Sequence, residues 1–371
     1  MRIVSVEASD TALLRKYVSL LSAAALESGE ATAPLNVDDM VARYQLPVTG
    51  WVERFWLAFP AQTTDATPTA PIGYAHASWS TGETNADLAS VNLWVTAPHR
   101  GQGVGTALLE RVLADLPAAR TRFFSYVCAD AASGPVETSA LPGPRFAREC
   151  GWRVTERVHL RRHPWPIDAD LLDRLDPSTP SEDGRRSLGP YSIETYVDGV
   201  PLELQEDFAR LLSLVEVEAP HGEIDLEPEE FTAENYREAL ERTRQVKATR
   251  VESVAIYTHP DGRRQAVGMS SYTAPAHPNS LIEVNSTIVE REHRGHRLGW
   301  AVKCAVERAL LGLDLPHKMV NSCNADSNDA MLAINNALGF KEVLQIADLV
   351  GERETISQRL AERRARHQVG K

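Results

Sequence analysis

The sequence has little cysteine, no long apolar run and a shortage of positive charge. Its four cysteines stand apart, without a Cys-x-x-Cys pair, which argues against a disulfide framework or a metal site and favours reduced thiols. No apolar run approaches the roughly 20 residues of a membrane helix, and the first residues lack the apolar core of a secretion signal. With 39 Lys and Arg against 51 Asp and Glu, the formal net charge is −12, so broad nucleic-acid binding is not expected. These absences favour a cytoplasmic protein that acts on small molecules or proteins, with no membrane and no nucleic acid among its partners.

What the chain of 371 residues does contain is a repeat. Three landmarks occur twice in the same order: a glycine that opens a short strand, a His-Arg-Gly loop, and a Gly-aromatic pair before a later strand. The pairs are Gly73 and Gly268, Arg100 and Arg294, and Gly151 and Gly339, at spacings of 195, 194 and 188 residues. A duplicated domain explains this order, with copies over 1–163 and 190–371. Residues 164–189 between them have the Pro, Asp, Ser and Gly content of a linker.

Each copy predicts the same succession of elements. A strand, helical stretches with apolar residues at three-to-four spacing, a hairpin and a longer strand precede the glycine loop. A helix, a strand, a second helix and a final strand follow it. This mixed order predicts an α+β fold with helices on the faces of a sheet.

The first glycine loop, "APHRGQGVGTALLERV" over 97–112, lies between a predicted strand and a predicted helix. The first backbone N–H groups of such a helix have no partner in the helix, and the helix dipole favours an anion there. Gly101, Gly103 and Gly105 allow close approach of the backbone, and Arg100 adds positive charge. A plain tight turn and a Rossmann loop are the alternatives. The strand-loop-helix context argues against the first, and the missing βαβ unit with an arginine inside the motif argues against the second.

These residues resemble motif A of the GNAT superfamily, the acetyl-CoA-dependent N-acetyltransferases. The Arg/Gln-x-x-Gly-x-Gly/Ala pattern of that motif matches Arg100, Gly103 and Gly105. The stretch "IVEREHRGHRLGWAVKCA" resembles it again, with Arg297 where the middle glycine is expected, and "CNADSNDAMLAINNALGF" resembles the closing motif of the family. The chain is thus similar to a tandem GNAT protein, in a layout like that of the actinobacterial mycothiol synthases. The resemblance implies two GNAT-like domains, each a twisted mixed sheet flanked by helices.

The resemblance also implies acetyl-CoA (coenzyme A) as cofactor, with its pyrophosphate held by the loop amides. In the first copy it assigns to the cofactor Val95, Arg100, Gly101, Gly103 and Gly105. In the second copy it assigns Ile288, Val289, Arg294, Gly295, His296, Arg297, Leu298, Gly299, Asn324 and Asn328. Arg297 either blocks close approach of the cofactor or contacts a phosphate itself.

The family often uses a carboxylate on the central strand as catalytic base. Glu283 stands 11 residues before Arg294, whereas Ala89 stands at the same distance before Arg100. The tyrosine that often serves as acid in this family is replaced by Asn335. Either another group such as Tyr272 or water supplies the proton, or the thiolate leaves unaided.

The closing motif separates the two copies further. In the first copy, Asp130 and Gly151 are separated by a Pro- and Gly-rich insertion, which should break or delay the helix that borders the pantetheine arm. We therefore expect the chemistry in the C-terminal half.

An acidic stretch over 216–231 lies where the family lines its acceptor pocket. Glu216, Glu218 and Asp225 could attract a cationic amine. The simpler interpretation of most of these acids is a solvated loop followed by a helix N-terminus.

These observations predict an acyltransferase that moves acetyl from acetyl-CoA to a primary amine of a small molecule, as a monomer or homodimer. Two alternatives stay open: an acyltransferase that uses another acyl donor, and a non-catalytic acyl-CoA-binding or scaffold protein.

Overall fold

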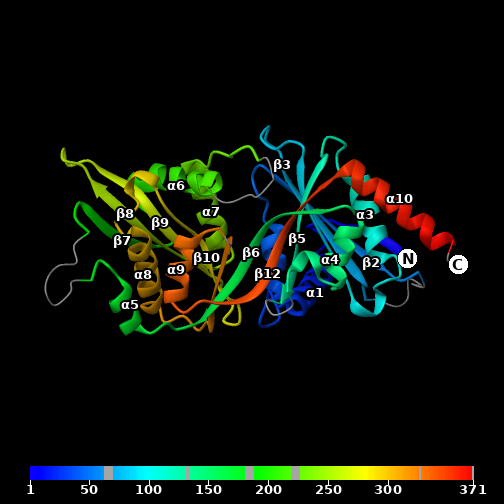
Figure 1. Ribbon diagram of the computed structural model, residues 1–371, viewed down its shortest axis with the longest axis horizontal. Coiled ribbons are helices and arrows are strands. Elements are labelled where there is room, and N and C mark those ends of the chain that lie inside the picture. Colours follow the sequence, from blue (N-terminus) through cyan, green and yellow to red (C-terminus); the bar gives the residue numbers. More distant parts are fainter. Residues whose placement is uncertain (62–69, 131–133, 180–187, 219–225, 326, 370–371) are drawn as a thin grey trace. The chain divides into compact units, whose positions relative to one another are not determined.

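The computed structural model describes residues 1–61, 70–130, 134–179, 188–218, 226–325 and 327–369, and the chain divides into two compact units (Figure 1). Unit 1 comprises Met1–Val158 and Leu344–Lys371, with a short segment that ends at Glu227. Unit 2 comprises His159–Pro220 and Pro228–Val343. Among the described helices, none has the length and apolar character that crossing a membrane requires.

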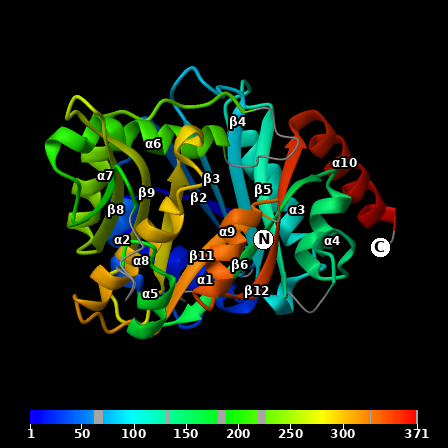
Figure 2. The same ribbon diagram turned by 60° about the vertical axis from the view of Figure 1, so that its left-hand side comes forward.

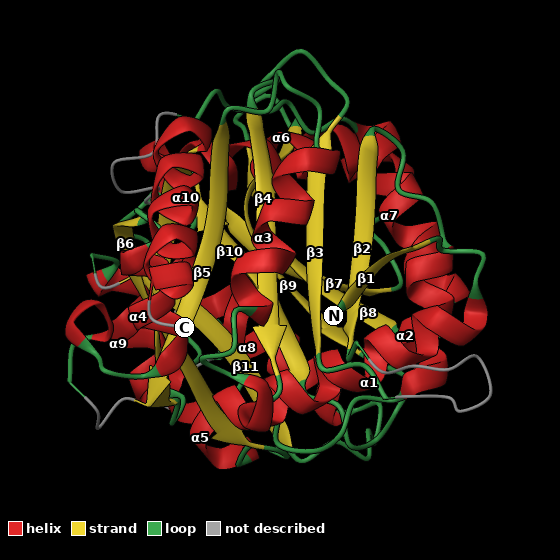
Figure 3. Cartoon of the chain, turned by 90° about the vertical axis from the view of Figure 1, so that its right-hand side faces the viewer, coloured by secondary structure: helices red, strands yellow, loops and turns green. Residues whose placement is uncertain are grey.

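Unit 1 is a mixed sheet with helices on both faces (Figure 3). Its strand order is β1-β2-β3-β4-β5-β12; β4 and β5 run parallel, and the other neighbouring strands run antiparallel. The strands are β1 (Arg2–Val6), β2 (Trp51–Phe59), β3 (Gly73–Ser80), β4 (Leu88–Val95), β5 (Arg122–Asp130) and β12 (Lys341–Glu352). The helices are α1 (Thr11–Ser28), α2 (Val37–Gln45), α3 (Val104–Asp115), α4 (Pro142–Glu149) and α10 (Arg353–Val369).

Helix α1 illustrates how the sequence builds unit 1. Asp10 caps its N-terminus by accepting a backbone N–H bond, and Gly29 ends it in the left-handed conformation at φ 82°. Leu14, Tyr17 and Val18 recur at helical spacing and are buried. They form one core with strand residues on the α1 and α2 face of the sheet, while α3, α4 and α10 share a second core on the opposite face.

Unit 2 repeats this architecture (Figure 2). Its strand order is β7-β8-β9-β10-β11-β6, and β10 runs parallel to β11. The strands are β6 (Arg153–Pro164), β7 (Tyr191–Val197), β8 (Thr249–Thr258), β9 (Arg264–Ala274), β10 (Ile282–Val289) and β11 (Met319–Ala325). The helices are α5 (Ala169–Leu175), α6 (Gln205–Glu218), α7 (Ala233–Gln245), α8 (Leu298–Leu311) and α9 (Asp329–Ala337).

The last strand of each half ends in the unit built mainly from the other half. Strand β12 pairs antiparallel with β5, from Leu344 opposite Asp130 to Glu352 opposite Arg122. Arg353 then fastens α10 to unit 1 by donating to the carbonyl oxygens of residues 113 and 120, at 2.7 and 2.8 Å. Conversely, residues 159–164 of β6 belong to unit 2. The units therefore differ from the contiguous division into 1–163 and 190–371, because the C-terminal strand and helix complete unit 1.

The parallel strands of each unit separate soon after they pair. In unit 1, β4 and β5 pair only over Leu88–Ser90 and Arg122–Phe124. In unit 2, β10 and β11 pair only over Ile282–Glu283 and Val320–Asn321. Beyond these residues the two parallel strands of each unit are not hydrogen-bonded to each other. Each sheet therefore has a gap beside its glycine loop.

Candidate functional site

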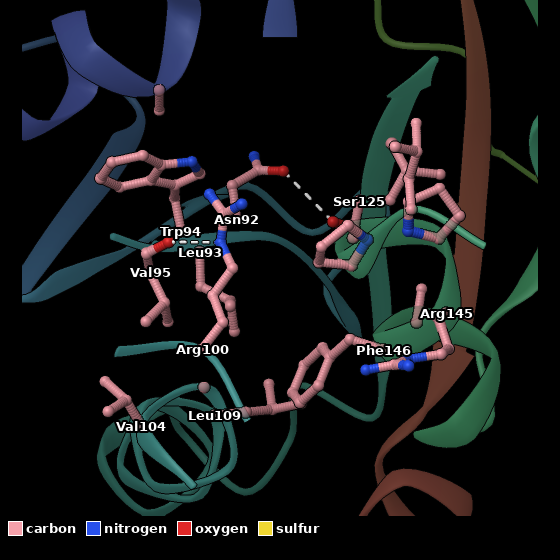
Figure 4. Close-up of a pocket in the computed structure, with 18 of the residues that line it drawn as sticks. Asn92, Leu93, Trp94, Val95, Arg100, Val104, Leu109, Ser125, Arg145 and Phe146 are labelled. Carbon is pink, nitrogen blue, oxygen red and sulfur yellow. Dashed lines mark hydrogen bonds between the residues drawn. The ribbon is translucent and has the colours of Figure 1, made fainter. Parts of the chain in front are cut away.

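The glycine loop of unit 1 is held by Arg100. Its Nε donates to the Val95 carbonyl oxygen at 2.8 Å (Figure 4). Its two terminal nitrogens form a bidentate ion pair with Glu27 at 2.6 Å. The guanidinium also lies over the ring of Trp94, 5.6 Å from its centre. Arg100 thus ties the loop to the end of β4 and to the end of α1, so its side chain is occupied by the protein itself.

The loop backbone is positioned to receive an anion. Gly101 and Gly103 adopt positive φ angles of 72° and 85°, and a Cβ atom added at either would meet nothing within 4 Å. Gly103 is the N-cap of α3, whose first N–H groups lack partners within the helix and whose dipole adds partial positive charge. The backbone N–H groups of 101–106 can therefore hold a phosphate group.

A cavity of about 360 Å³ opens beside this loop. It reaches from the loop and α3, through the gap between β4 and β5, to the end of α1. Leu93, Leu109 and Phe146 give it an apolar wall. Ser125 donates to Asn92 at 3.2 Å across the gap (Figure 4). The structure thus brings all five cofactor residues expected in the first copy, Val95 to Gly105, to one cavity.

The second helix beside this cavity is shifted along the chain. Helix α4 begins only at Pro142, after β5 ends at Asp130, so the Pro- and Gly-rich insertion delays the helix rather than abolishing it. Helix α10 adds Arg363, which pairs with Glu149 and lies over the ring of Phe146. The exchanged C-terminal segment therefore forms part of the cavity wall.

The end of α1 brings a carboxylate and a phenol together in the cavity. The Tyr126 hydroxyl donates to Glu30 at 3.0 Å, and the Ser28 hydroxyl donates to the other oxygen of Glu30 at 2.6 Å. Desolvation and the nearby Glu30 carboxylate raise the pKa of Tyr126 above its ordinary value, although the side chain is 38% exposed. Sequence reasoning missed this pair, because only the fold brings together two residues 96 positions apart.

The glycine loop of unit 2 is anchored in the same way. Arg294 donates through Nε to the Val289 carbonyl oxygen at 3.0 Å and forms an ion pair with Glu218 on α6. Arg291 lies 4.0 Å from the same carboxylate. Glu218, which the sequence analysis assigned to the acceptor, therefore fastens the loop. Glu216 is exposed, and Asp225 lies outside the described residues.

Arg297 has the same backbone conformation as its counterpart Gly103 and adds an exposed guanidinium group to the loop. It adopts the left-handed conformation at φ 59° and is the N-cap of α8. Its guanidinium is exposed and lies 5.9 Å from the centre of the Trp300 ring. A left-handed backbone costs a non-glycine residue about 1 kcal/mol. Unit 2 thus keeps the loop conformation that glycine would favour.

The interior of unit 2 contains hydrogen-bonded polar side chains between α8, α9 and β11. Lys303 on α8 is fully buried and donates to the Asn335 side-chain oxygen on α9 at 2.7 Å. Asn335 in turn donates to Asn324 and Ser322 on β11. Burial lowers the pKa of Lys303 to about 8, although the carboxylate of Glu307 opposes this shift. Hydrogen bonds therefore link α8, α9 and β11 directly.

The equivalent positions in unit 1 are apolar. Lys303 follows Arg294 by nine residues, as Leu109 follows Arg100, and Asn335 precedes Gly339 by four residues, as Ala147 precedes Gly151. Leu109 and Ala147 both line the cavity.

Tyr272 lies inside unit 2, away from its surface. It is fully buried, and its hydroxyl donates to Glu307 at 3.0 Å. The His163 ring lies 3.1 Å from the same carboxylate oxygen. Burial and Glu307 raise the pKa of Tyr272 well above its ordinary value. In this position the hydroxyl supports the core under α8 and is not presented to a ligand.

Glu283 lies on β10 where that strand still pairs with β11. It accepts a hydrogen bond from Asn321 at 2.9 Å, and Asn321 accepts one from Arg162 at 3.1 Å. Glu283 is half-buried. The carboxylate is thus held in a chain of polar contacts, at the position that the sequence analysis assigned to a base.

The remaining predicted cofactor residues of unit 2 have structural contacts. Leu298 is buried and Ile288 packs against a core cluster. The His296 ring lies 5.1 Å from the Tyr191 ring. Asn328 caps α9 by accepting from the Met331 N–H at 3.2 Å.

Two glycines in unit 2 keep the backbone features expected of the motif. Gly295 has φ 85°. A Cβ atom at Gly299 would lie 3.3 Å from Ile334, as one at Gly105 would lie 3.4 Å from Phe146. In the described part of the chain, no group of three or more His, Cys, Asp or Glu side chains is arranged to hold a metal ion.

Comparisons with known proteins agree with this architecture. Neither protein-family models nor curated proteins match the sequence. Among solved structures, a tandem GNAT protein from the clavulanic acid biosynthesis pathway is 23% identical with a TM-score of 0.70, over 95% of this chain and 98% of that one. A GCN5-related N-acetyltransferase from Sphaerobacter thermophilus is 15% identical with a TM-score of 0.58, over 95% and 96%. A GNAT-family acetyltransferase from Colwellia psychrerythraea is 11% identical with a TM-score of 0.50, over 95% and 100%. The chain therefore has the fold of a tandem GNAT protein.

Proposed function

We propose that the protein is an acyltransferase that moves acetyl from acetyl-CoA to a primary amine of a small molecule, and that unit 1 holds the acetyl-CoA. The observation that carries this proposal is the cavity of unit 1, which joins the glycine loop to the gap between β4 and β5. When bound, acetyl-CoA supplies the acetyl group as an activated thioester.

The residues of unit 1 fit this cofactor. The backbone N–H groups of 101–106 would hold the pyrophosphate, because Gly101 and Gly103 leave open space beside the backbone. The edge of β4 beyond Ser90 has no partner in β5, so its peptide groups would hold the amides of the pantetheine arm. Leu109 and Phe146 would exclude water from that arm.

We assign acetyl-CoA to unit 1 because of the geometry of its cavity, and not because of where the candidate base stands. The sequence favours the C-terminal half because Glu283 stands there and because an insertion interrupts the closing motif of the first copy. The geometry supports unit 1, because unit 2 has the buried Lys303–Asn335 hydrogen bond at positions where unit 1 has apolar side chains around a cavity. Unit 2 then serves as a structural partner, and Glu283 contributes to its strand pairing.

An amine acceptor fits the charges on the wall of the cavity. Glu30 lines it near the end of α1, and a carboxylate attracts the ammonium form of an amine. Acyl transfer needs the neutral amine, so a proton acceptor must lie within reach of the acceptor nitrogen.

Thiol release tests the proposal. The full-length protein is mixed with acetyl-CoA and, in turn, spermidine, glucosamine and lysine, and free thiol is followed with a thiol-reactive dye. We expect release that depends on the amine for at least one of these acceptors. Absence of amine-dependent release, together with no acetyl-CoA binding at millimolar concentration, would contradict the proposal.

A further inference from the structure

Two aromatic side chains line the cavity of unit 1 on the α1 and α2 face of its sheet. Tyr74 on β3 lies opposite Trp94 on β4 in the antiparallel register. Their ring centres are 6.4 Å apart, with an angle of 30° between the ring planes. Tyr74 is 6% exposed and belongs to the core under α1, and Trp94 is half-buried beside it. Because both side chains line the cavity, they form an aromatic pair on its wall.

The aromatic pair carries two polar groups, a phenol hydroxyl and an indole N–H. Among the described residues, neither the Tyr74 hydroxyl nor the Trp94 N–H has a hydrogen-bond partner. Tyrosine and tryptophan usually find such a partner when they are buried, as the Trp56 indole does by donating to Asp115 at 2.7 Å. The polar groups of the pair can therefore bond to a molecule that enters the cavity.

The equivalent positions in unit 2 are apolar. Met269 and Ile288 stand at the same distances from the glycine and arginine landmarks of the second copy, and they too lie opposite each other on neighbouring antiparallel strands. Both pack in a hydrophobic core with residues of α6 and α7. The fold thus accepts apolar side chains at these two positions, so packing alone does not account for the phenol and the indole of unit 1.

The polar groups of the pair select a ligand that carries oxygen atoms. An indole N–H can only donate, and a phenol can donate or accept. Burial and the Glu30 carboxylate raise the pKa of Tyr74, so its hydroxyl keeps its proton at neutral pH. A ligand without oxygen atoms would leave both groups unpaired in a closed site, and such a site rejects it in favour of one that bonds to them.

A second cation is a poor match for the Trp94 ring. The Arg100 guanidinium already lies over that ring, 5.6 Å from its centre, so a further positive charge would meet like charge there. A saturated ring with hydroxyl groups fits better, because its C–H groups pack against aromatic rings and its hydroxyls bond to the polar groups at their edges.

We propose, on the basis of the function proposed above, that Tyr74 and Trp94 form the acceptor subsite of unit 1 and that the acceptor is a ring amine with hydroxyl groups, as in an amino sugar. The Tyr74 hydroxyl and the Trp94 N–H donate to two oxygen atoms of this ring. Asn92 lies on the same face of β4, two residues closer to the point where β4 and β5 separate. The amine is thus directed along β4 toward the gap assigned to the pantetheine arm.

The first test measures acceptor binding without acetyl-CoA. Saturation-transfer NMR at pH 7 compares glucosamine with cyclohexylamine, a ring amine without hydroxyl groups. We expect the wild-type protein to bind glucosamine about tenfold more tightly than cyclohexylamine. Tyr74→Phe removes only the hydroxyl and should reduce this preference about fivefold. Tyr44→Phe removes a phenol that packs against the same core but is not among the described residues lining the cavity, and it should leave the preference intact.

The residues of unit 2 supply a second variant. Tyr74→Met combined with Trp94→Ile gives unit 1 the side chains that unit 2 has at these positions, and it removes both donors. We expect this double variant to lose the preference for glucosamine. It should bind acetyl-CoA as the wild type does, because the loop backbone over 101–106 is unchanged.

The outcomes separate this inference from the proposed function. Failure of the wild type to prefer glucosamine, or a preference that Tyr74→Phe and the double variant keep, overturns the assignment of the subsite. A preference that is present in the wild type and lost in the variants, with no acetyl-CoA binding at millimolar concentration, overturns the proposed function and leaves the subsite in place. Where both ligands bind, kcat/KM for thiol release should be about tenfold higher with glucosamine than with spermidine, and the reverse order would contradict the inference.

Discussion

The two glycine loops are anchored alike, yet they lead to different interiors. Arg100 and Arg294 each donate to the carbonyl oxygen of the last residue of the preceding strand, and each pairs with a glutamate of the first long helix of its unit. Behind the loop, unit 1 has a cavity lined by Leu109, whereas unit 2 has the buried amine of Lys303. The arginine contacts are therefore part of the loop structure in both units. The side chains behind the loop determine whether a cofactor has room to bind there.

This difference teaches that a motif can persist for structural reasons alone. A guanidinium group that satisfies a strand-end carbonyl and pairs with a carboxylate stabilises the loop whether or not a ligand binds. A fully buried lysine, in contrast, is stable only with polar partners, and here Asn335 supplies one. Under the proposed function, the loop of unit 2 is therefore a structural element.

The largest expected effect comes from a carboxylate placed at the equivalent loop position of each unit. Gly103→Glu should weaken acetyl-CoA binding about a hundredfold, because a negative charge would face the pyrophosphate and displace it from the loop amides. Arg297→Glu should leave the affinity unchanged. Isothermal titration calorimetry measures both, and the opposite ranking of the two variants would place the cofactor in unit 2.

An exchange of interior residues should have a smaller effect. Leu109→Lys puts a charge into unit 1 without the partner that Asn335 provides, so it should lower the free energy of unfolding by about 3 kcal/mol and impair acetyl-CoA binding. The converse double variant, Lys303→Leu with Asn335→Ala, should change stability less and keep the affinity. Urea unfolding and calorimetry report the two properties. If the double variant lost acetyl-CoA binding, unit 2 would be the binding unit.

The smallest expected effect is a pH dependence of stability that belongs to Lys303. Its pKa in the folded protein is about 8, below the value of about 10.4 for an unfolded lysine. Between these pH values the unfolded chain binds more protons, so stability rises with pH by up to about 1.4 kcal/mol per pH unit from this group. Below pH 8 both states carry the proton and this contribution is constant.

Lys303→Met should remove that rise. Urea-unfolding curves at pH 7.5, 9 and 10 for wild type and variant give the difference in the free energy of unfolding. A difference that stays constant over this range would show that the lysine is charged inside unit 2 throughout.

Much of the fold could be predicted from the sequence, because its signals are local. The repeat, the strand-loop-helix context of Gly101 and Gly103 and the spacing of the landmarks suffice for two GNAT-like halves. The exchange of final strands could not be predicted, since β6 and β12 both follow a Gly-aromatic pair and have similar patterns. The pairing of β12 with β5 and the packing of Arg353 and α10 against unit 1 distinguish the two arrangements.

The candidate site was less predictable than the fold. The sequence identified Asn335 as a departure from the family, but its partner Lys303 lies in a helix whose pattern gives no sign of a buried amine. Glu30 follows a helix-ending glycine, and nothing local connects it to Tyr126. Glu283 drew attention because a carboxylate on the central strand is a familiar base, whereas the structure engages it with Asn321.

The most direct test of the account is hydrogen–deuterium exchange with and without acetyl-CoA, read on peptides that cover 96–110 and 290–304. The two peptides contain equivalent loops, so each is the control for the other. We predict that acetyl-CoA slows exchange at the amides of 101–106 and leaves 295–300 unchanged. Slowed exchange at 295–300 with none at 101–106 would contradict the assignment of the cofactor to unit 1.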